Sequence, residues 1–305
     1  MNASPTSVDR RKFLKTAGVA VAAATGSLAM RHAAAQESSK MLRKAVKIGM
    51  VRQGKTLKEK FQLVKDLGYD GIELNSPNRL DPDEVLRARD DVGLAIPGVV
   101  DSVHWRDTLS HQDAAVRAKG LAGLKQALRD AKLYGASTVL LVPAVVNQDV
   151  SYDQAYERSQ LEIRKALPLA EELGVGIAVE NVWNHFLLSP LEEARYLDEF
   201  DSPSIGAHFD IGNVVAFGWP EQWIRILGKR ILKLDIKEYS RKIQNEQGMY
   251  KGFSAKLGDG DVNWSAVMQA LREVGYQGWA TAEVAGGGRK RLQDIAQRMD
   301  RCFAA

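Results

Sequence analysis

Short apolar segments alternate with amphipathic stretches along most of the chain. We read eight of these segments as strands, at residues 46–51, 70–74, 95–100, 138–142, 175–180, 205–210, 231–237 and 278–284. The stretches between them, such as 113–135 and 156–174, carry apolar residues near i, i+3, i+4 and i+7, which predicts helices. Eight alternations in about 260 residues predict a (β/α)8 TIM barrel. An open doubly wound sheet is the alternative, but no glycine-rich dinucleotide fingerprint follows the first segment.

Each of the last four strand segments brings a carboxylate toward the end of the strand. The four residues are Glu180, Asp210, Asp235 and Glu283. Side chains alternate along a strand, and the inward-facing residues of a barrel meet at the carboxyl ends of its strands, where barrel enzymes carry out their chemistry. The sequence therefore predicts that these four side chains converge.

Four converging carboxylates repel one another unless a positive charge lies between them. A divalent cation would supply that charge. Oxygen ligands favour Mn²⁺, Mg²⁺ or Co²⁺, with Zn²⁺ as a further candidate, and His208 offers a nitrogen nearby. The alternative for any one carboxylate is that it caps a helix or pairs with an inward lysine such as Lys237.

The first 35 residues have a composition of their own. Residues 7–15, SVDRRKFLK, precede an Ala-rich apolar run from Val19 to Met30 and a small-residue site at residues 33–35. This pattern resembles a twin-arginine export signal, with Asp9 at the usual hydroxyl position. We expect a signal at 1–35, a linker at 36–45 and a barrel domain at 46–305, in a periplasmic or otherwise exported protein that meets the membrane only during export. An uncleaved anchor or a chance basic terminus is the alternative.

The charge of the remaining chain argues against a nucleic-acid partner. Residues 1–35 hold five of the 42 Lys and Arg and one of the 38 Asp and Glu, so 37 bases and 37 acids remain and the formal net charge falls from +4 to zero. Nucleic-acid binders usually keep a basic excess. Cys302 is the only cysteine, which excludes a disulfide within the chain.

Several motifs together resemble the sugar phosphate isomerase/epimerase superfamily with its xylose-isomerase-like barrel. The resemblance runs from about Lys47 to Cys302. It is carried by GYDGIEL (68–74), GVGIAVEN (174–181), GAHFDIGN (206–213), LKLDIKEY (232–239), LGDGDVNW (257–264) and GYQGWATAEV (275–284).

The resemblance implies a metal held by Glu180, Asp210 and Glu283. Relatives often place a histidine where this chain has Asp235, and another where it has Asn213. His208 could replace a lost imidazole.

A metal site of this kind would acidify a C–H next to a carbonyl. Glu180 and Glu283 would transfer the proton through a cis-enediolate, which predicts an isomerase or epimerase of a keto-sugar or related polyol. A metal-dependent lyase or hydrolase of keto-glycosides and a non-catalytic sugar-binding barrel are the alternatives. A homo-oligomer is possible.

Five further residues are candidates for binding the sugar. They are Glu73, His104, His185, Asn213 and Lys237. A structural role is the alternative for Glu73, His104 and Lys237, and an ordinary loop position is the alternative for His185.

Overall fold

The computed structural model describes residues 41–305. The predicted export signal at 1–35 and residues 36–40 of the predicted linker lie outside these residues. Within the described part of the chain, no helix is both long and apolar enough to span a membrane.

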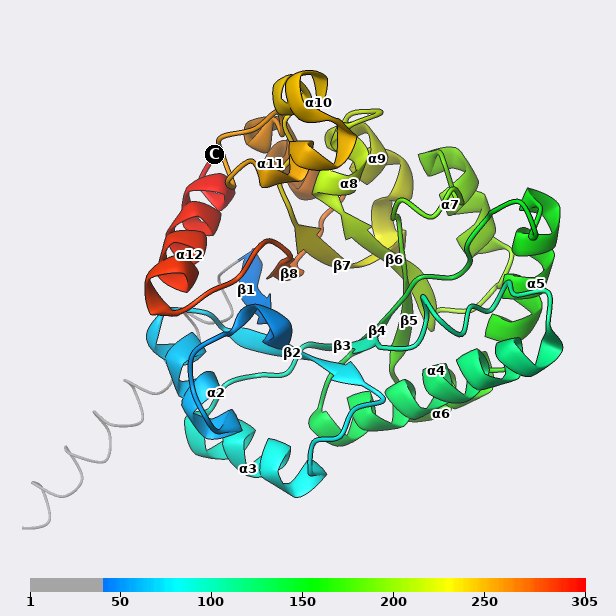
Figure 1. Cartoon of the computed structure of the whole chain (residues 1–305), viewed down its shortest axis with the longest axis horizontal. Helices are drawn as coiled ribbons and strands as arrows, with labels where there is room; N and C mark the ends of the chain where they lie inside the picture. The colour runs from blue at the N-terminus through cyan, green and yellow to red at the C-terminus, as the bar shows by residue number, and fades with distance from the viewer. Residues whose placement is uncertain (1–40) are drawn as a thin grey trace, which may run out of the picture. The chain divides into compact units, whose positions relative to one another are not determined.

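Eight parallel strands form a closed barrel in sequence order (Figure 1). Every strand pairs with its neighbours in the chain, and β1 pairs with β8 to close the ring. The predicted TIM barrel is therefore confirmed. The strands are β1 (Leu42–Lys47), β2 (Gly71–Ser76), β3 (Gly98–Asp101), β4 (Thr138–Leu141), β5 (Gly176–Glu180), β6 (Ile205–Asp210), β7 (Ile231–Ile236) and β8 (Gly278–Ala282).

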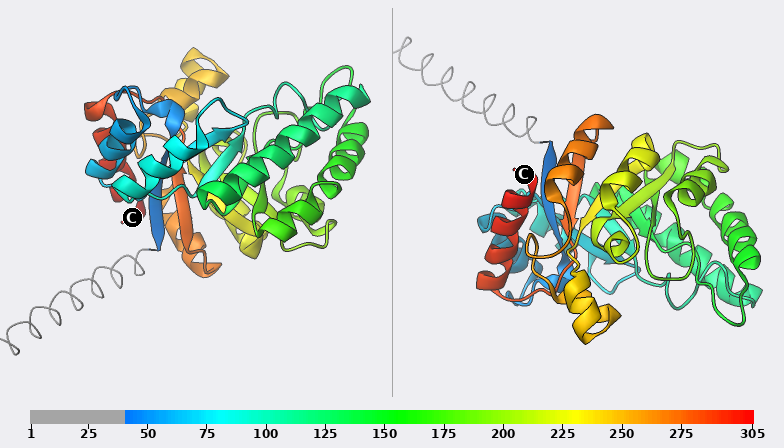
Figure 2. Two further views of the ribbon diagram at one scale, coloured as in Figure 1. Left: turned by 90° about the horizontal axis from the view of Figure 1, so that it is seen from below. Right: turned by 90° about the horizontal axis from the view of Figure 1, so that it is seen from above.

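Helices surround the barrel as an outer layer (Figure 1). They are α2 (Leu57–Asp66), α3 (Pro82–Val92), α4 (Ala114–Tyr134), α5 (Tyr152–Arg164), α6 (Leu167–Leu173), α7 (Pro190–Asp198), α8 (Ile211–Val215), α9 (Pro220–Leu227), α10 (Arg241–Gln247), α11 (Trp264–Glu273) and α12 (Arg289–Phe303), with 3-10 turns η1 (Ile48–Met50), η2 (Gly228–Arg230) and η3 (Met249–Ser254). Figure 2 shows α10 projecting from the end of the barrel opposite to the start of β1. The excursion that contains α10 and η3 therefore lies at the carboxyl-terminal mouth.

The first strand begins earlier than the sequence predicts. β1 covers Leu42–Lys47, whereas 46–51 was predicted, and Ile48–Met50 form a 3-10 turn instead. Arg43 and Lys44 interrupt the apolar pattern of this strand in the sequence. In the structure both side chains have partners: the Arg43 guanidinium lies 4.1 Å from the Trp279 ring centroid, and Lys44 pairs with Asp300 at 2.6 Å. Long basic side chains can cover apolar surface while their charge stays paired. Residues 42–45, within the predicted linker, are thus part of the barrel.

The predicted helix at 156–174 is two helices. α5 ends at Arg164 and α6 begins at Leu167, with Pro168 in its first turn. Proline has no N–H to continue the hydrogen bonds of the preceding helix, so a helix is readily restarted there.

A polar layer fills the barrel one step below the carboxyl ends of the strands. Lys233 of β7 and Glu73 of β2 are both buried and form an ion pair across the interior. Thr281 Oγ1 also donates to Glu73 Oε1 at 2.8 Å. Gly98 of β3 leaves the space that the Lys233 ammonium occupies. The next inward position along β7 is Asp235, so this layer supports the residues at the mouth.

Candidate active site

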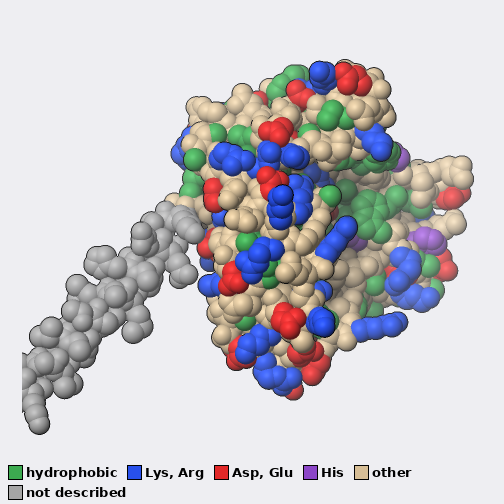
Figure 3. Space-filling view, turned by 60° about the vertical axis from the view of Figure 1, so that its left-hand side comes forward, with side chains coloured by type: hydrophobic (Ala, Val, Ile, Leu, Met, Phe, Trp, Pro, Cys, Tyr) green, Lys and Arg blue, Asp and Glu red, His purple; other side chains and the backbone are tan. Residues whose placement is uncertain are grey.

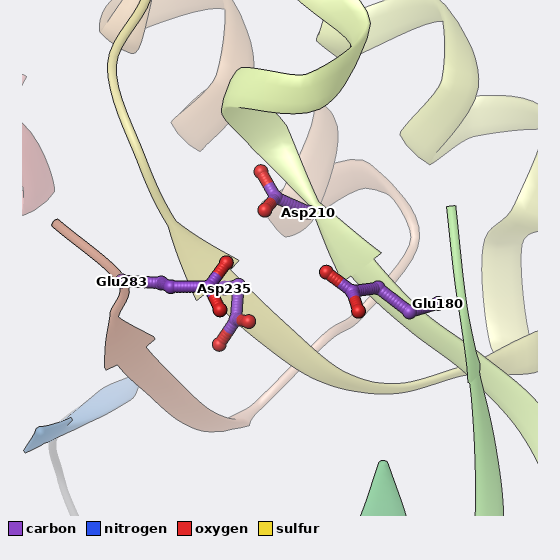
Figure 4. Close-up of side chains that lie close together, drawn as sticks. All are labelled: Glu180, Asp210, Asp235 and Glu283. Carbon is purple, nitrogen blue, oxygen red and sulfur yellow. The ribbon is translucent and has the colours of Figure 1, made fainter. Parts of the chain in front are cut away.

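Four carboxylates converge at the mouth of the barrel, as predicted. Glu180 ends β5, Asp210 ends β6, Asp235 lies near the end of β7, and Glu283 follows β8. One oxygen from each lies within 4.8 Å of one from each of the others, and their side chains point toward a common centre (Figure 4). Glu180 and Glu283 approach this centre from opposite sides. Inward alternation along four neighbouring strands is enough to produce this cluster.

Two lysines lie among the carboxylates. Lys47 Nζ is 2.7 Å from Asp235 Oδ2 and 2.6 Å from Glu283 Oε1. Lys237 Nζ is 2.7 Å from Asp210 Oδ2 and 2.6 Å from Glu283 Oε2. Glu283 therefore accepts one lysine at each oxygen, and two positive charges partly offset four negative ones.

These contacts change two of the sequence interpretations. Lys237 was a candidate sugar ligand, with pairing to a carboxylate as its alternative, and it pairs with both Asp210 and Glu283. Lys47 was not predicted as a site residue, because the first strand was placed four residues too late. In the correct register Lys47 is the last residue of β1, next to Glu73 of β2, and a lysine at the end of a barrel strand indicates a residue at the mouth.

Burial and charge separate the acidities of the two glutamates. Burial raises the pKa of Glu180 to about 8, and the negative charge of Glu283 adds to the effect while Lys47 and Lys237 oppose it. Burial also acts to raise the pKa of Glu283, but Lys47 and Lys237 outweigh it and hold that pKa at about 2. Among residues 41–305 the Glu180 carboxylate forms no hydrogen bond or ion pair. Two equivalent side chains thus have different surroundings within one site.

The aspartates follow the same rule. Burial raises the pKa of Asp210 to about 6, against the attraction of Lys237. For Asp235, burial is outweighed by Lys47 and His208, so its pKa lies below the ordinary value. His208 is fully buried, and its Nε2 lies 3.1 Å from Asp235 Oδ1. His208 therefore lies beside Asp235, and the four converging ligand atoms come from the carboxylates alone.

Two asparagines fix Asp210 and join β5 to α8. Asn181 accepts from the Asp210 backbone N–H at 2.7 Å and donates to the Asp210 carbonyl at 2.9 Å. Asn213 donates to the Asn181 carbonyl at 3.0 Å, and its Oδ1 lies 3.2 Å from Lys237 Nζ. Asn213, a predicted sugar ligand, thus reaches the site through Lys237, whereas the sequence analysis gave no role to Asn181.

The other predicted sugar ligands are more dispersed. Glu73 is enclosed in the lower layer with Lys233, which supports its structural alternative. His104 is buried and accepts from the Val142 N–H at 3.1 Å; burial, with Lys47, lowers the pKa of its imidazole to about 3, so it is neutral. His185 is exposed on the loop after β5 and lies outside the carboxylate cluster.

An unpaired acid that the sequence analysis missed lies near Glu180. Glu193 of α7 is fully buried, and neither of its carboxylate oxygens has a hydrogen-bond partner in the described part of the chain. Burial raises the pKa of Glu193 to about 8, and the charge of Glu180 contributes. Only the fold reveals this residue, because the sequence pattern of α7 is that of an ordinary amphipathic helix.

The carboxylate cluster fits a hard divalent cation. Its ligand atoms are carboxylate oxygens, as Mn²⁺ and Mg²⁺ prefer. Four carboxylates and two ammonium groups leave a formal charge of −2, which one divalent cation neutralises. The unpaired Glu180 carboxylate could become a ligand without loss of an existing partner.

Comparison with known proteins identifies the family. The family model described as "Xylose isomerase-like TIM barrel" matches residues 61–302. The chain belongs to this family. L-ribulose-5-phosphate 3-epimerase UlaE of Escherichia coli O1:K1 is 25% identical over 255 residues, covering 78% of this chain and 87% of UlaE. The protein of that name from Salmonella typhi is 26% identical over 259 residues, with the same coverage.

Solved structures of the xylose isomerase-like barrel resemble the chain in fold. The 3-keto-D-glucoside 4-epimerase YcjR from E. coli has a TM-score of 0.72 and 16% identity, with 87% of this chain and 100% of YcjR covered. An L-ribulose 3-epimerase has a TM-score of 0.71 and 17% identity, with 86% and 95% covered. The prediction of a sugar isomerase or epimerase agrees with these relatives, which are sugar epimerases by name.

Proposed function

We propose that the protein is a divalent-metal-dependent epimerase of a keto-sugar. The observation that carries the proposal is the placement of Glu180 and Glu283 on opposite sides of a carboxylate cluster suited to a cation. The names of the curated relatives support the reaction class.

Glu180, Asp210, Asp235 and Glu283 would hold the cation. When bound, the cation would polarise the carbonyl of the sugar and make the neighbouring C–H more acidic. Lys47 and Lys237 would then share their carboxylate partners with the ligand set and lose part of their present pairing.

The two glutamates would carry the proton. One removes it from the carbon next to the carbonyl on one face of the sugar, and the other returns a proton to that carbon on the opposite face, which inverts the centre. The cis-enediolate formed between these steps bears negative charge on oxygen. Lys237 and Lys47 lie within the same cluster and would stabilise this charge.

Aromatic side chains next to Lys237 would exclude water from the site. The ammonium of Lys237 lies 5.3 Å from the Phe253 ring centroid, and Phe253 packs against Trp183 with ring centroids 4.7 Å apart. Phe253 comes from η3, so the excursion after β7 covers the mouth. A dry site strengthens the attraction between the lysines and the enediolate.

Chromatography of ketoses incubated with the protein tests the proposal. D-Fructose, D-tagatose and L-ribulose, with Mn²⁺ or Mg²⁺ added, are expected to yield epimers with the full chain and none with Glu283→Gln. Release of smaller sugars or of a free aglycone from a keto-glycoside would instead support the lyase or hydrolase alternative. No change in any ketose or keto-glycoside would contradict the proposal.

A further inference from the structure

An apolar cavity opens beside the carboxylate cluster. Its volume is about 660 Å³, and it lies between the loop after β5, the α8–α9 segment and η3. Asn181 and Asn213 line it; Asn181 accepts a hydrogen bond from the Asp210 N–H, and Asn213 contacts Lys237. The cavity therefore borders the proposed reaction site through these two asparagines.

Large hydrophobic side chains gather in this cavity. Nine of them are exposed in residues 41–305, and five of the nine line it. Figure 3 shows hydrophobic side chains gathered in a hollow of the surface. The five are Leu188, Phe217, Trp219, Met249 and Tyr250. Single exposed hydrophobic residues are common on protein surfaces, but a cluster of them usually marks a binding site. The five residues therefore indicate a binding surface beside the carboxylates.

The aromatic walls are held in place by hydrogen bonds. Trp183 Nε1 donates to the Asn213 carbonyl at 2.9 Å. Arg241 donates to the Val215 carbonyl at 2.9 Å and to the Gly218 carbonyl at 2.8 Å. These contacts fix both ends of the segment that carries Phe217, so the cavity is shaped before a ligand enters.

The lining excludes several kinds of occupant. Among the residues that the structure describes, no Asp, Glu, Lys or Arg lines the cavity, so a phosphate or carboxylate there would lose its hydration without gaining a lysine or arginine partner. Aromatic and aliphatic side chains predominate in the lining, which also holds five polar side chains, so a bare sugar would leave much of the apolar surface uncovered. A flat apolar group fits both the rings and the volume, which lies in the range of small-molecule sites.

We infer that the substrate is a glycoside whose aromatic aglycone occupies this cavity while its keto-sugar lies at the carboxylates. This inference rests on the proposed function for the sugar end and on the cavity for the aglycone end. It adds an aromatic aglycone to the keto-sugar that the proposed function already requires.

Calorimetric binding of a matched ligand pair tests the inference. Phenyl β-D-glucopyranoside is expected to bind the full chain about tenfold more tightly than methyl β-D-glucopyranoside, because only the phenyl ring can fill the apolar cavity. Phe217→Ala and Trp219→Ala are expected to reduce this ratio to about threefold or less. Leu161→Ala, which removes an exposed leucine of α5 outside the cavity, is the control and should leave the ratio unchanged.

The outcomes separate the inference from the proposed function. Equal binding of the two glycosides, or no binding of either, would overturn the inference whatever the enzyme does to ketoses. A phenyl preference without epimerisation of any keto-sugar would retain the cavity assignment and remove the proposed function. A second copy of the chain is the other occupant to test, by sedimentation of the same variants. A parent that forms a dimer and shows no phenyl preference, with a dimer that dissociates in Phe217→Ala, would assign the cavity to that second copy and overturn the inference.

Discussion

Lys47 and Glu283 form an ion pair of 2.6 Å across the seam where β1 closes against β8. Lys47 also contacts Asp235 at 2.7 Å. Lys47, the last residue of the strand that closes the barrel, therefore also offsets part of the negative charge of the carboxylates at the mouth.

Lys47→Met should strengthen metal binding. The substitution changes the formal charge of the cluster from −2 to −3, so a divalent cation is expected to bind about tenfold more tightly. The metal-free protein is expected to lose stability, because the buried Asp235 and the part-exposed Glu283 each lose one cationic partner. Titration with Mn²⁺, followed by the rise in melting temperature, measures both effects. Lys58→Met, at an exposed pair with Asp91, is the control. Weaker metal binding in Lys47→Met would mean that Lys47 helps to build the cation site.

Asp210→Asn should remove the metal. Protein purified without chelator is expected to contain about one equivalent of Mn, Mg, Co or Zn by mass spectrometry, and the substitution should reduce this to background because one anionic ligand is lost. Asp91→Asn removes an exposed carboxylate of α3 and should leave the content unchanged. Equal metal in the parent and in Asp210→Asn would exclude the carboxylate cluster as the site.

Glu193→Gln should stabilise the protein at neutral and alkaline pH. The folded pKa of Glu193 is about 8, above its ordinary 4.5, so the folded state binds more protons between these values and stability falls as pH rises through that window. Glutamine keeps the shape and never ionises. The melting temperature of the variant should exceed that of the parent at pH 8, and the difference should vanish near pH 4. A difference independent of pH would show that Glu193 is paired or hydrated in solution.

Residues 1–40 should direct export. We propose the twin-arginine route, on the strength of Arg10, Arg11 and the Phe13-Leu14-Lys15 sequence that follows. Fused to a reporter enzyme, this segment is expected to place the reporter in the periplasm, and replacement of both arginines by lysine should retain it in the cytoplasm. Export that survives the double replacement would indicate another route.

The alternation of strands and helices was sufficient to predict the fold and the four carboxylates. Each of Glu180, Asp210, Asp235 and Glu283 lies at a strand end, where the period of two decides which way a side chain points. Such residues depend only on local pattern, so sequence alone places them.

Residues that depend on register or on tertiary packing were not predictable in this way. Lys47 was not predicted because Arg43 and Lys44 interrupt the apolar pattern of β1, so the strand was placed too late in the sequence. Glu193 becomes a candidate only when its burial is known. The aromatic cavity forms only where three segments that are distant in the sequence meet. The partners of Lys237 likewise follow from the arrangement of neighbouring strands rather than from adjacent residues.

The exchange of a carbon-bound hydrogen with solvent tests the central claim most directly. An accepted keto-sugar incubated in D₂O with Mn²⁺-supplemented protein should gain one deuterium next to its carbonyl for each molecule epimerised, as measured by mass spectrometry. Glu180→Gln and Glu283→Gln should each slow this exchange about a hundredfold or more, and chelator should abolish it until metal is restored. Exchange at the parent rate in both variants, or epimerisation without deuterium, would contradict proton transfer by the paired glutamates.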